Sequence, residues 1–439
     1  MKLGRLSSFL KKNFSDIFPS KEKIKRFYGV SLYRNASYLM LNSVVGAILG
    51  FFFWIVVARL YTTSEVGLVS ALLASMGLLN SLSFFGFDIG MTRFLPDEKD
   101  KAGMINSCFT IIGASVMVLS MIFILGAPIW SPAIAFVLNE PTYLLIFMLL
   151  TLGSSIYIML SCVFVALRAA YLSFVTQTIM GVLKIVFAVM LVRLGTMGIF
   201  SSWGLASLIA LLVGDLVLLR VALPGYAPRL ALKRGILNEI VHFSASNYFA
   251  EAIASLPAYL LPIMVVNLLG VNQSAYYRIA YGIAVVLWAL PNGVITALFA
   301  EGSTKPKELH TNAIKAIKFI LLFLVPTLLI ILFLGDKILL LFGQKYSENA
   351  FRLLQLLSLS SIPMSIAHLY IVIKRVELNI KPVIYLYSAM AIFIIGGCLG
   401  LMRQFDITGV GIGWILGYGI IAVVAGAFII KWFKGSGSG

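Results

Sequence analysis

The chain is poor in charge and in residues that support metal or redox chemistry. Of its 439 residues only 12% are Asp, Glu, Lys or Arg, whereas 60% are hydrophobic. A water-soluble domain of that size needs more polar surface than this composition supplies. The three Cys and three His form no Cys-x-x-Cys or His-Glu-x-x-His motif, and no Gly-x-x-x-x-Gly-Lys-Ser/Thr sequence occurs. These absences argue against a soluble protein, a metalloenzyme and a nucleotide hydrolase, and we predict that the chain is not an enzyme.

Long apolar segments fill most of the chain instead. A helix that crosses a bilayer needs roughly 20 mainly apolar residues. By that criterion we predict an all-α polytopic membrane protein with about twelve transmembrane helices. Their approximate bounds are 36–58, 65–87, 104–127, 142–167, 171–193, 198–220, 240–269, 275–299, 313–334, 351–373, 382–402 and 409–430.

Positive residues gather in the segment before the first span and in every second loop after it. The intervening loops are poor in charge, and those at 128–141 and 270–274 hold no Lys or Arg. Basic loops stay on the cytoplasmic side of a membrane, so we predict that both termini are cytoplasmic. The net charge of +17 also favours anionic membrane lipids as partners. Nucleic acid is not an expected partner, because the charge is spread over membrane-proximal loops.

The basic stretch around 220–239 separates six predicted spans from six others. Similar short sequences, Asn35-Ala-Ser-Tyr-Leu and Ser244-Ala-Ser-Asn-Tyr-Phe, begin the two halves. Parallel repeats of this kind are typical of transporters whose site lies between the halves. We therefore predict a basic cytoplasmic segment at 1–34, an N-lobe at 35–222, a linker at 223–239, a C-lobe at 240–434 and a tag-like Gly-Ser linker at 435–439.

A set of short motifs lies between Asn35 and Pro96. They are Asn35-Ala-Ser-Tyr-Leu, Ala58-Arg59-Leu-Tyr, Glu65-Val-Gly-Leu, Leu82-Ser-Phe-Phe-Gly86 and Thr92-Arg93-Phe-Leu-Pro96. This run resembles the O-antigen-type oligosaccharide flippases of polysaccharide biosynthesis, in the multidrug/oligosaccharidyl-lipid/polysaccharide exporter superfamily. Many members of that superfamily carry fourteen spans, so a chain with about twelve is less similar to the peptidoglycan-precursor branch.

The resemblance implies two six-helix lobes arranged as a V around a central cavity. It also implies alternating access that moves a polyprenyl-(pyro)phosphate-linked oligosaccharide outward across a prokaryotic plasma membrane. A polysaccharide polymerase or ligase is a further partner that the resemblance implies.

Four charged residues stand out by their position inside predicted spans, namely Lys184, Asp215, Glu251 and Arg278. A charge deep in a bilayer costs several kcal/mol, so such residues usually face a wet cavity or a partner. We predict that Arg278 and Lys184 contact the substrate phosphates, which Arg binds through paired hydrogen bonds and Lys as a point charge. The alternatives are snorkelling of Arg278 to the interface and an ion pair between Lys184 and Asp215 or Glu251.

Two polar stripes at helical spacing predict further cavity-facing residues. The first stripe contains Asn42 and the second contains Asn247, Tyr248 and Glu251. Hydrogen bonding between helices is the alternative explanation of these residues. Arg59 and Arg93, near the outer and inner surfaces, are further candidate substrate contacts, with interfacial snorkelling and a charge role in topology as the respective alternatives.

No cofactor is expected, but a coupling ion, H⁺ or Na⁺, is a possible requirement. Burial favours the protonated form of a carboxylate, which makes Glu251 and Asp215 the predicted ion-coupling residues. Downhill, uncoupled flipping is an alternative. The second candidate function is organic-cation antiport, which calls for an anionic, aromatic cavity, whereas the four residues above predict mixed charge. A membrane enzyme or a synthase scaffold would need catalytic side chains or large loops, and neither is visible.

Overall fold

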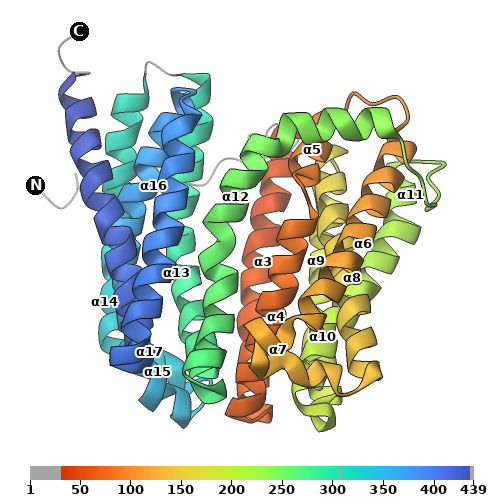
Figure 1. The fold of residues 1–439 in the computed structure, drawn as a ribbon. Helices are drawn as coiled ribbons and strands as arrows, with labels where there is room; N and C mark the ends of the chain where they lie inside the picture. The colour runs from red at the N-terminus through yellow and green to blue at the C-terminus, as the bar shows by residue number, and fades with distance from the viewer. Residues whose placement is uncertain (1–30, 306–307, 436–439) are drawn as a thin grey trace, which may run out of the picture.

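The computed structural model describes residues 31–305 and 308–435, and it contains no strand within them. Among these residues, eleven helical segments are long and apolar enough to cross a membrane. The last of them, Lys381–Lys434, is interrupted at Asp406 (φ 53°, ψ −143°) and contains two of the predicted spans. The predicted all-α polytopic class is confirmed (Figure 1). The predicted segments 1–34 and 435–439 lie largely outside the described residues.

The first half of the chain forms six passes. They are α3 (Ser31–Leu60), α4 (Thr63–Ser83) with α5 (Phe87–Phe94), α6 (Lys101–Leu125), α8 (Pro141–Ala166), α9 (Ala170–Met190), and α10 (Gly195–Val213), which continues through the π-helix η3 (Gly214–Leu218) into α11 (Leu219–Ala222). The short α7 (Ala127–Trp130), η1 (Pro132–Leu138) and η2 (Val192–Leu194) lie in connections. The second predicted span, 65–87, is broken between α4 and α5. Gly86 sits there with φ 80°, a left-handed conformation that favours glycine.

The second half also forms six passes. They are α12 (Arg234–Leu268), α13 (Val271–Thr304), α14 (Leu309–Leu340), α15 (Gln344–Leu359) running directly into α16 (Ser361–Val376), and the two arms of α17 (Ile380–Gly435). The arms of α17 are antiparallel neighbours, because the Cys398 thiol contacts the Val410 carbonyl at 3.4 Å. α12 begins at Arg234, inside the predicted linker, and carries Pro257 and Pro262 in its interior.

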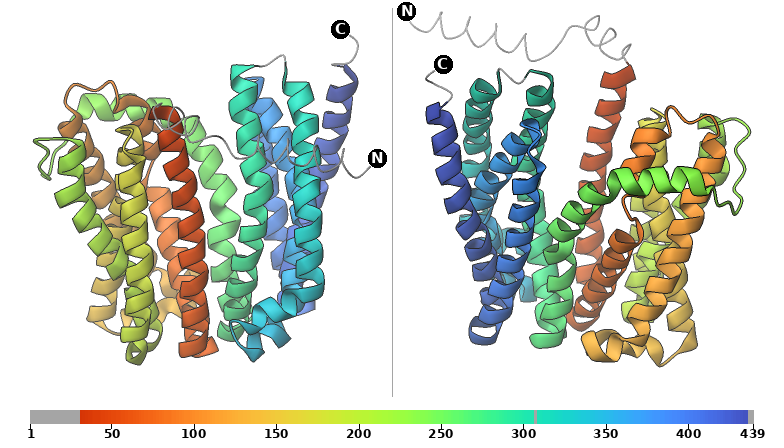
Figure 2. Two further views of the ribbon diagram at one scale, coloured as in Figure 1. Left: turned by 180° about the vertical axis from the view of Figure 1, so that it is seen from behind. Right: turned by 45° about the horizontal axis from the view of Figure 1, so that its top comes forward.

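Two faces of the molecule are defined by its connections. The start of α3 and the end of α17 lie toward the top of Figure 1, and we call this side the terminal face. The connections at 60–63, 125–141, 268–271 and 340–344 form the opposite face. The helices α3–α11 and α12–α17 come together toward the opposite face and diverge toward the terminal face, while α12 starts above the first group and bends down into the second (Figures 1 and 2).

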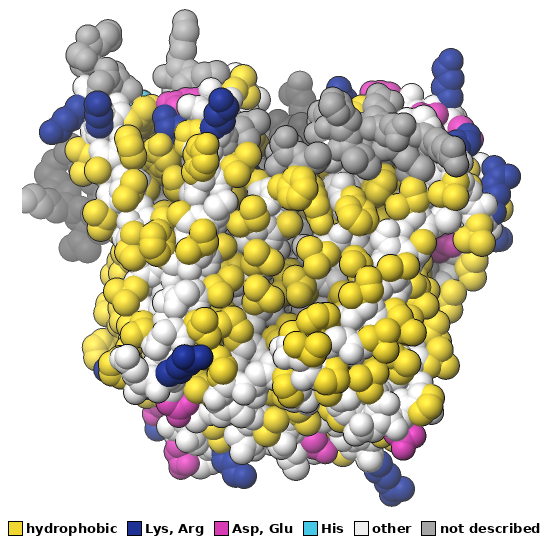
Figure 3. All heavy atoms as spheres, in the orientation of Figure 1, with side chains coloured by type: hydrophobic (Ala, Val, Ile, Leu, Met, Phe, Trp, Pro, Cys, Tyr) yellow, Lys and Arg dark blue, Asp and Glu magenta, His cyan; other side chains and the backbone are white. Residues whose placement is uncertain are grey.

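The outside of the molecule is apolar between these faces. Figure 3 shows hydrophobic side chains across the middle of one side, with most charged side chains gathered near the top and bottom. Large apolar side chains such as Leu322, Phe333 and Val423 are exposed in this belt. In water such a surface is unfavourable, whereas lipid chains cover it at no such cost.

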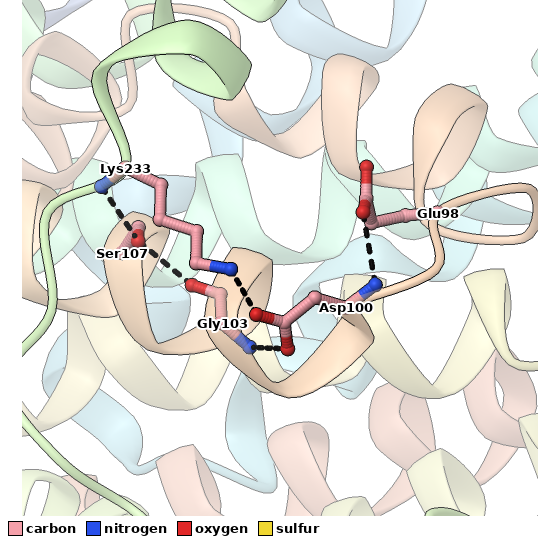
Figure 4. Close-up of polar contacts among 5 residues, drawn as sticks. All are labelled: Glu98, Asp100, Gly103, Ser107 and Lys233. Atoms are coloured by element: carbon pink, nitrogen blue, oxygen red, sulfur yellow. Dashed lines mark hydrogen bonds and ion pairs between the residues drawn. The ribbon is translucent and has the colours of Figure 1, made fainter.

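The connection from α11 to α12 is bound to α6 by hydrogen bonds and an ion pair. Asp100 caps α6 by accepting a hydrogen bond from the Gly103 amide at 2.8 Å, and the Lys233 ammonium binds the same carboxylate (Figure 4). The hydrogen bond from Lys233 lowers the pKa of Asp100. The Lys233 amide donates to the Ser107 hydroxyl at 3.2 Å, and Asn106 donates to the carbonyl of Ala227 at 2.9 Å. Residues 227–233 are therefore held on the first group of helices.

Candidate functional site

A cavity of about 580 Å³ lies between the two groups of helices. Its walls come from α3, α4, α8, α9 and α10 on one side and from α12 and α13 on the other, with Phe342 after α14. This volume falls within the roughly 300–1,000 Å³ typical of small-molecule sites. The cavity therefore accommodates a head group of that size and lies where the internal repeat predicts a site.

Two cations line this cavity, and they come from opposite walls. Lys184 on α9 is only 3% exposed, and its Nζ lies 4.5 Å from the centroid of the Trp203 ring and 5.3 Å from that of Phe53. Arg278 on α13 places its Cζ 4.4 Å from the Trp54 ring of α3. Each cation thus rests against aromatic faces, a contact worth about 0.5–2 kcal/mol.

Neither cation has a carboxylate partner in the described part of the chain, and no Asp or Glu lines the cavity. The Nε of Arg278 is buried and has no hydrogen-bond partner. Burying a charged group without hydrogen bonds or a counter-ion is unfavourable. An anionic ligand between the two walls would supply the missing partners of both cations.

Neutral polar side chains line the same cavity. The Tyr157 hydroxyl donates to Gln177 Oε1 at 2.9 Å, and the Asn80 amide donates to the Ser154 hydroxyl at 3.0 Å. The sequence does not single out these residues or the tryptophans, because a neutral residue inside an apolar span carries little signal. One signal was present: Gln177 and Lys184 are seven residues apart, which places them on the same side of one helix.

The other predicted substrate contacts with described side chains are not among the residues that line the cavity. Asn42 has a buried Oδ1 without a partner, and the Tyr248 hydroxyl donates to the Leu82 carbonyl at 3.0 Å. Arg93 is exposed, 4.0 Å from Asp97. Asn247 belongs to a stretch of α12 whose side chains are not described. Of the predicted substrate-binding residues with described side chains, the structure brings only Lys184 and Arg278 together.

The two predicted ion-coupling carboxylates also lie outside the cavity lining. Asp215, in η3, accepts a hydrogen bond from the Tyr226 hydroxyl at 2.9 Å. Glu251 is exposed on α12, two helical turns from the cavity-lining Ala258 on the side of the terminal face. The mixed charge expected for the cavity is therefore not what the structure shows, and neither carboxylate forms an ion pair with Lys184.

Comparison with known proteins decides the family. The sequence profile of the polysaccharide biosynthesis protein family matches residues 56–351. The chain belongs to this family. No match was found among curated proteins.

Several solved structures share the fold of this polysaccharide biosynthesis protein. The lipid II flippase MurJ in an inward closed conformation superposes with a TM-score of 0.71 at 14% identity, over 89% of this chain and 87% of that one. An inward-facing multidrug resistance MATE family transporter of the MOP superfamily gives 0.61 at 15% identity, over 92% and 98%. An outward-facing MATE structure gives 0.56 at 16% identity, over 92% and 96%. The predicted V-shaped exporter fold is confirmed, and we call α3–α11 the N-lobe and α12–α17 the C-lobe.

The two lobes of this family member are joined at the opposite face. The guanidinium of Arg59, at the end of α3, binds the carbonyls of Leu340 and Leu341 at the end of α14, with Nε 2.9 Å from the Leu341 oxygen. The Ser274 hydroxyl of α13 donates to the Gly67 carbonyl of α4 at 3.1 Å. These contacts join the lobes at the face where their helices come together, whereas the lobes diverge toward the terminal face (Figures 1 and 2).

Proposed function

We propose that this protein is a flippase that moves a polyprenyl-(pyro)phosphate-linked oligosaccharide from the cytoplasmic to the outer leaflet of a prokaryotic plasma membrane. The observation that carries the proposal is a cavity lined by Lys184 and Arg278 and, in the described part of the chain, by no carboxylate. The family description, polysaccharide biosynthesis, and the fold shared with a protein named as a lipid II flippase support it.

Substrate binding follows from the positions of the two cations. Arg278 offers its planar set of N–H donors and Lys184 a compact charge, and both suit phosphate oxygens. Because the cavity walls are largely apolar, attraction between these charges and a phosphate is stronger there than in water. Lys184 belongs to the N-lobe and Arg278 to the C-lobe, so a bound pyrophosphate links the lobes.

The arrangement of the two lobes suggests how the substrate enters and leaves the cavity. With the basic loops cytoplasmic, the terminal face is the cytoplasmic face, and the substrate enters there between the diverging lobes. Rearrangement of the lobes then breaks the contacts at the opposite face and exposes the site to the outside. The head group crosses while the lipid chain stays in the bilayer, and a polysaccharide polymerase or ligase uses the product.

Organic-cation antiport is the second candidate, because MATE transporters share the fold. An organic cation entering this cavity would meet Lys184 and Arg278 with no carboxylate to offset their charge. The geometry therefore favours the anionic substrate. For energy coupling we propose H⁺ or Na⁺ binding at Glu251, with Asp215 as the second candidate.

Reconstituted liposomes test the function directly. A fluorescent polyprenyl-pyrophosphate oligosaccharide is placed in both leaflets, and its accessibility to a membrane-impermeant quencher is measured with and without the protein. We expect protein-dependent flipping, and we expect it to be lost in the Lys184→Met/Arg278→Met double variant. Absence of flipping together with uptake of an organic cation in exchange for protons would reject the flippase and establish the antiporter.

A further inference from the structure

Gln177 presents an unused pair of hydrogen-bond donors to the cavity. Its Oε1 accepts a hydrogen bond from the Tyr157 hydroxyl, which fixes the orientation of the amide. The Nε2 group, which carries two N–H donors, has no partner in the described part of the chain. A half-buried amide with free donors is unusual in an apolar span, where polar groups normally pair with neighbouring helices.

Two glycines on α3 leave room for the polar groups of α9. A Cβ atom at Gly46 would lie 2.8 Å from Gln177 Nε2, and one at Gly50 would lie 4.0 Å from Lys184 Nζ. Both glycines line the cavity, as do Gln177 and Lys184. The glycine at position 46 therefore keeps the amide of Gln177 open to the cavity.

The amide and the cations occupy different levels of the cavity. Gln177 precedes Lys184 by two turns of α9, a rise of about 10 Å toward the terminal face. On the facing wall, the apolar Val285 of α13 follows Arg278 by the same two turns, and the polar lining residues of the C-lobe besides Arg278 are Tyr259 and Tyr281. Gln177 and Tyr157 therefore supply polar groups of the N-lobe on the terminal-face side of the two cations.

We propose that Gln177, oriented by Tyr157 and uncovered by Gly46, forms a sugar subsite of the N-lobe that contacts the first sugar of the lipid-linked substrate. This inference rests on the proposed flippase function. The first sugar is bonded to the phosphate that Lys184 and Arg278 hold, so it lies next to them. The donors of Gln177 pair with sugar hydroxyl or carbonyl oxygens, and the Tyr157 oxygen can accept from a hydroxyl.

The test separates the sugar from the pyrophosphate. The probes are two fluorescent lipids, undecaprenyl pyrophosphate without a sugar and undecaprenyl pyrophosphate bearing one N-acetylglucosamine, assayed in liposomes. Gln177→Met keeps the length of the side chain but removes its hydrogen bonds. We expect it to slow flipping of the sugar-bearing probe about three- to tenfold while leaving the sugar-free probe unchanged, which is the effect of one or two hydrogen bonds.

Two further variants sharpen the result. Gly46→Ala, which forces the Gln177 amide to move, should shift the ratio of the two rates in the same direction. Gln355→Met is the matched control, because the Gln355 amide donates to the Leu332 carbonyl at 3.0 Å and does not line the cavity. If Gln177→Met left the ratio of the two flipping rates unchanged, whether both rates stayed the same or both fell equally, the sugar subsite alone would be overturned. If the unsubstituted protein flips neither probe, the proposed function fails and the subsite with it.

Discussion

The charged groups between the lobes differ sharply in their surroundings according to depth. Lys184 and Arg278 lie deep, against the rings of Trp203 and Trp54 and without a counter-ion. Nearer the terminal face, Glu251 is exposed on α12, and Asp88 of α5 and Arg375 of α16 are half-buried. Buried cations without a carboxylate partner are unfavourable for the empty protein, and this is the reason for proposing that these two bind a ligand. The charges nearer the terminal face are of mixed sign, and we propose that they exchange small ions instead.

Removing Lys184 or Arg278 should have the largest effect on the flipping rate. We expect Lys184→Met and Arg278→Met each to reduce flipping of the pyrophosphate lipid about 10- to 100-fold, since a hydrogen bond to a charged group contributes about 1.5–3 kcal/mol. The same substitutions should leave thermal stability of the ligand-free protein unchanged or raise it, because a poorly paired buried charge is removed. Flipping rates and melting temperatures in detergent measure the two effects.

A lysine on the lipid side supplies the control for this experiment. Lys318 of α14 is exposed and lies outside the cavity, so Lys318→Met should leave flipping unchanged. If Lys184→Met instead unfolded the protein while Lys318→Met did not, the ammonium of Lys184 would be a structural group. The difference between the deep charges and those nearer the terminal face would then not indicate a substrate site.

Hydropathy and the free energy of burying charge account for what the sequence predicted. Twelve passes follow from apolar segments alone, and Lys184 and Arg278 stood out because charge is rare in such segments. The length of α12 and the break at Gly86 depend on packing between distant helices, since Gly86 lies against Ser244. The placement of Glu251 outside the cavity depends on the angle between the lobes, which periodicity within one helix does not determine.

The contact made by Arg59 joins the two lobes at the opposite face, and we expect its removal to have the next largest effect. Arg59 is exposed, and its hydrogen bonds to the carbonyl end of α14 contribute about 1–2 kcal/mol. We expect Arg59→Ala to shift the lobes toward the state open on the opposite face. In a protein without its native cysteines, the thiol introduced by Ala258→Cys should react several-fold faster with an impermeant maleimide added from outside.

Arg193 provides the matched control for the closure, because it is exposed near the same face and does not bridge the lobes. Arg193→Ala should leave the labelling rate unchanged. Equal labelling in Arg59→Ala and the unsubstituted protein would show that the packing of α4 on α13 closes the cavity by itself.

Substitution of Glu251 should have the smallest effect on the flipping rate at any single pH. It tests whether the charges nearer the terminal face couple transport to an ion. Glu251→Gln keeps the size of the side chain but cannot exchange a proton or offer a carboxylate to Na⁺. We expect flipping to continue at a rate within a few-fold of the unsubstituted protein, because Glu251 does not line the cavity, but to lose its dependence on a pH or Na⁺ gradient.

Asp215→Asn is the comparison, because Asp215 accepts a hydrogen bond from Tyr226, which lies in the connection between the lobes. Loss of gradient dependence in Asp215→Asn alone would move the coupling site into the N-lobe. Retention in both variants would mean that neither carboxylate couples transport, and the deep cations would then bind and release substrate down its own gradient.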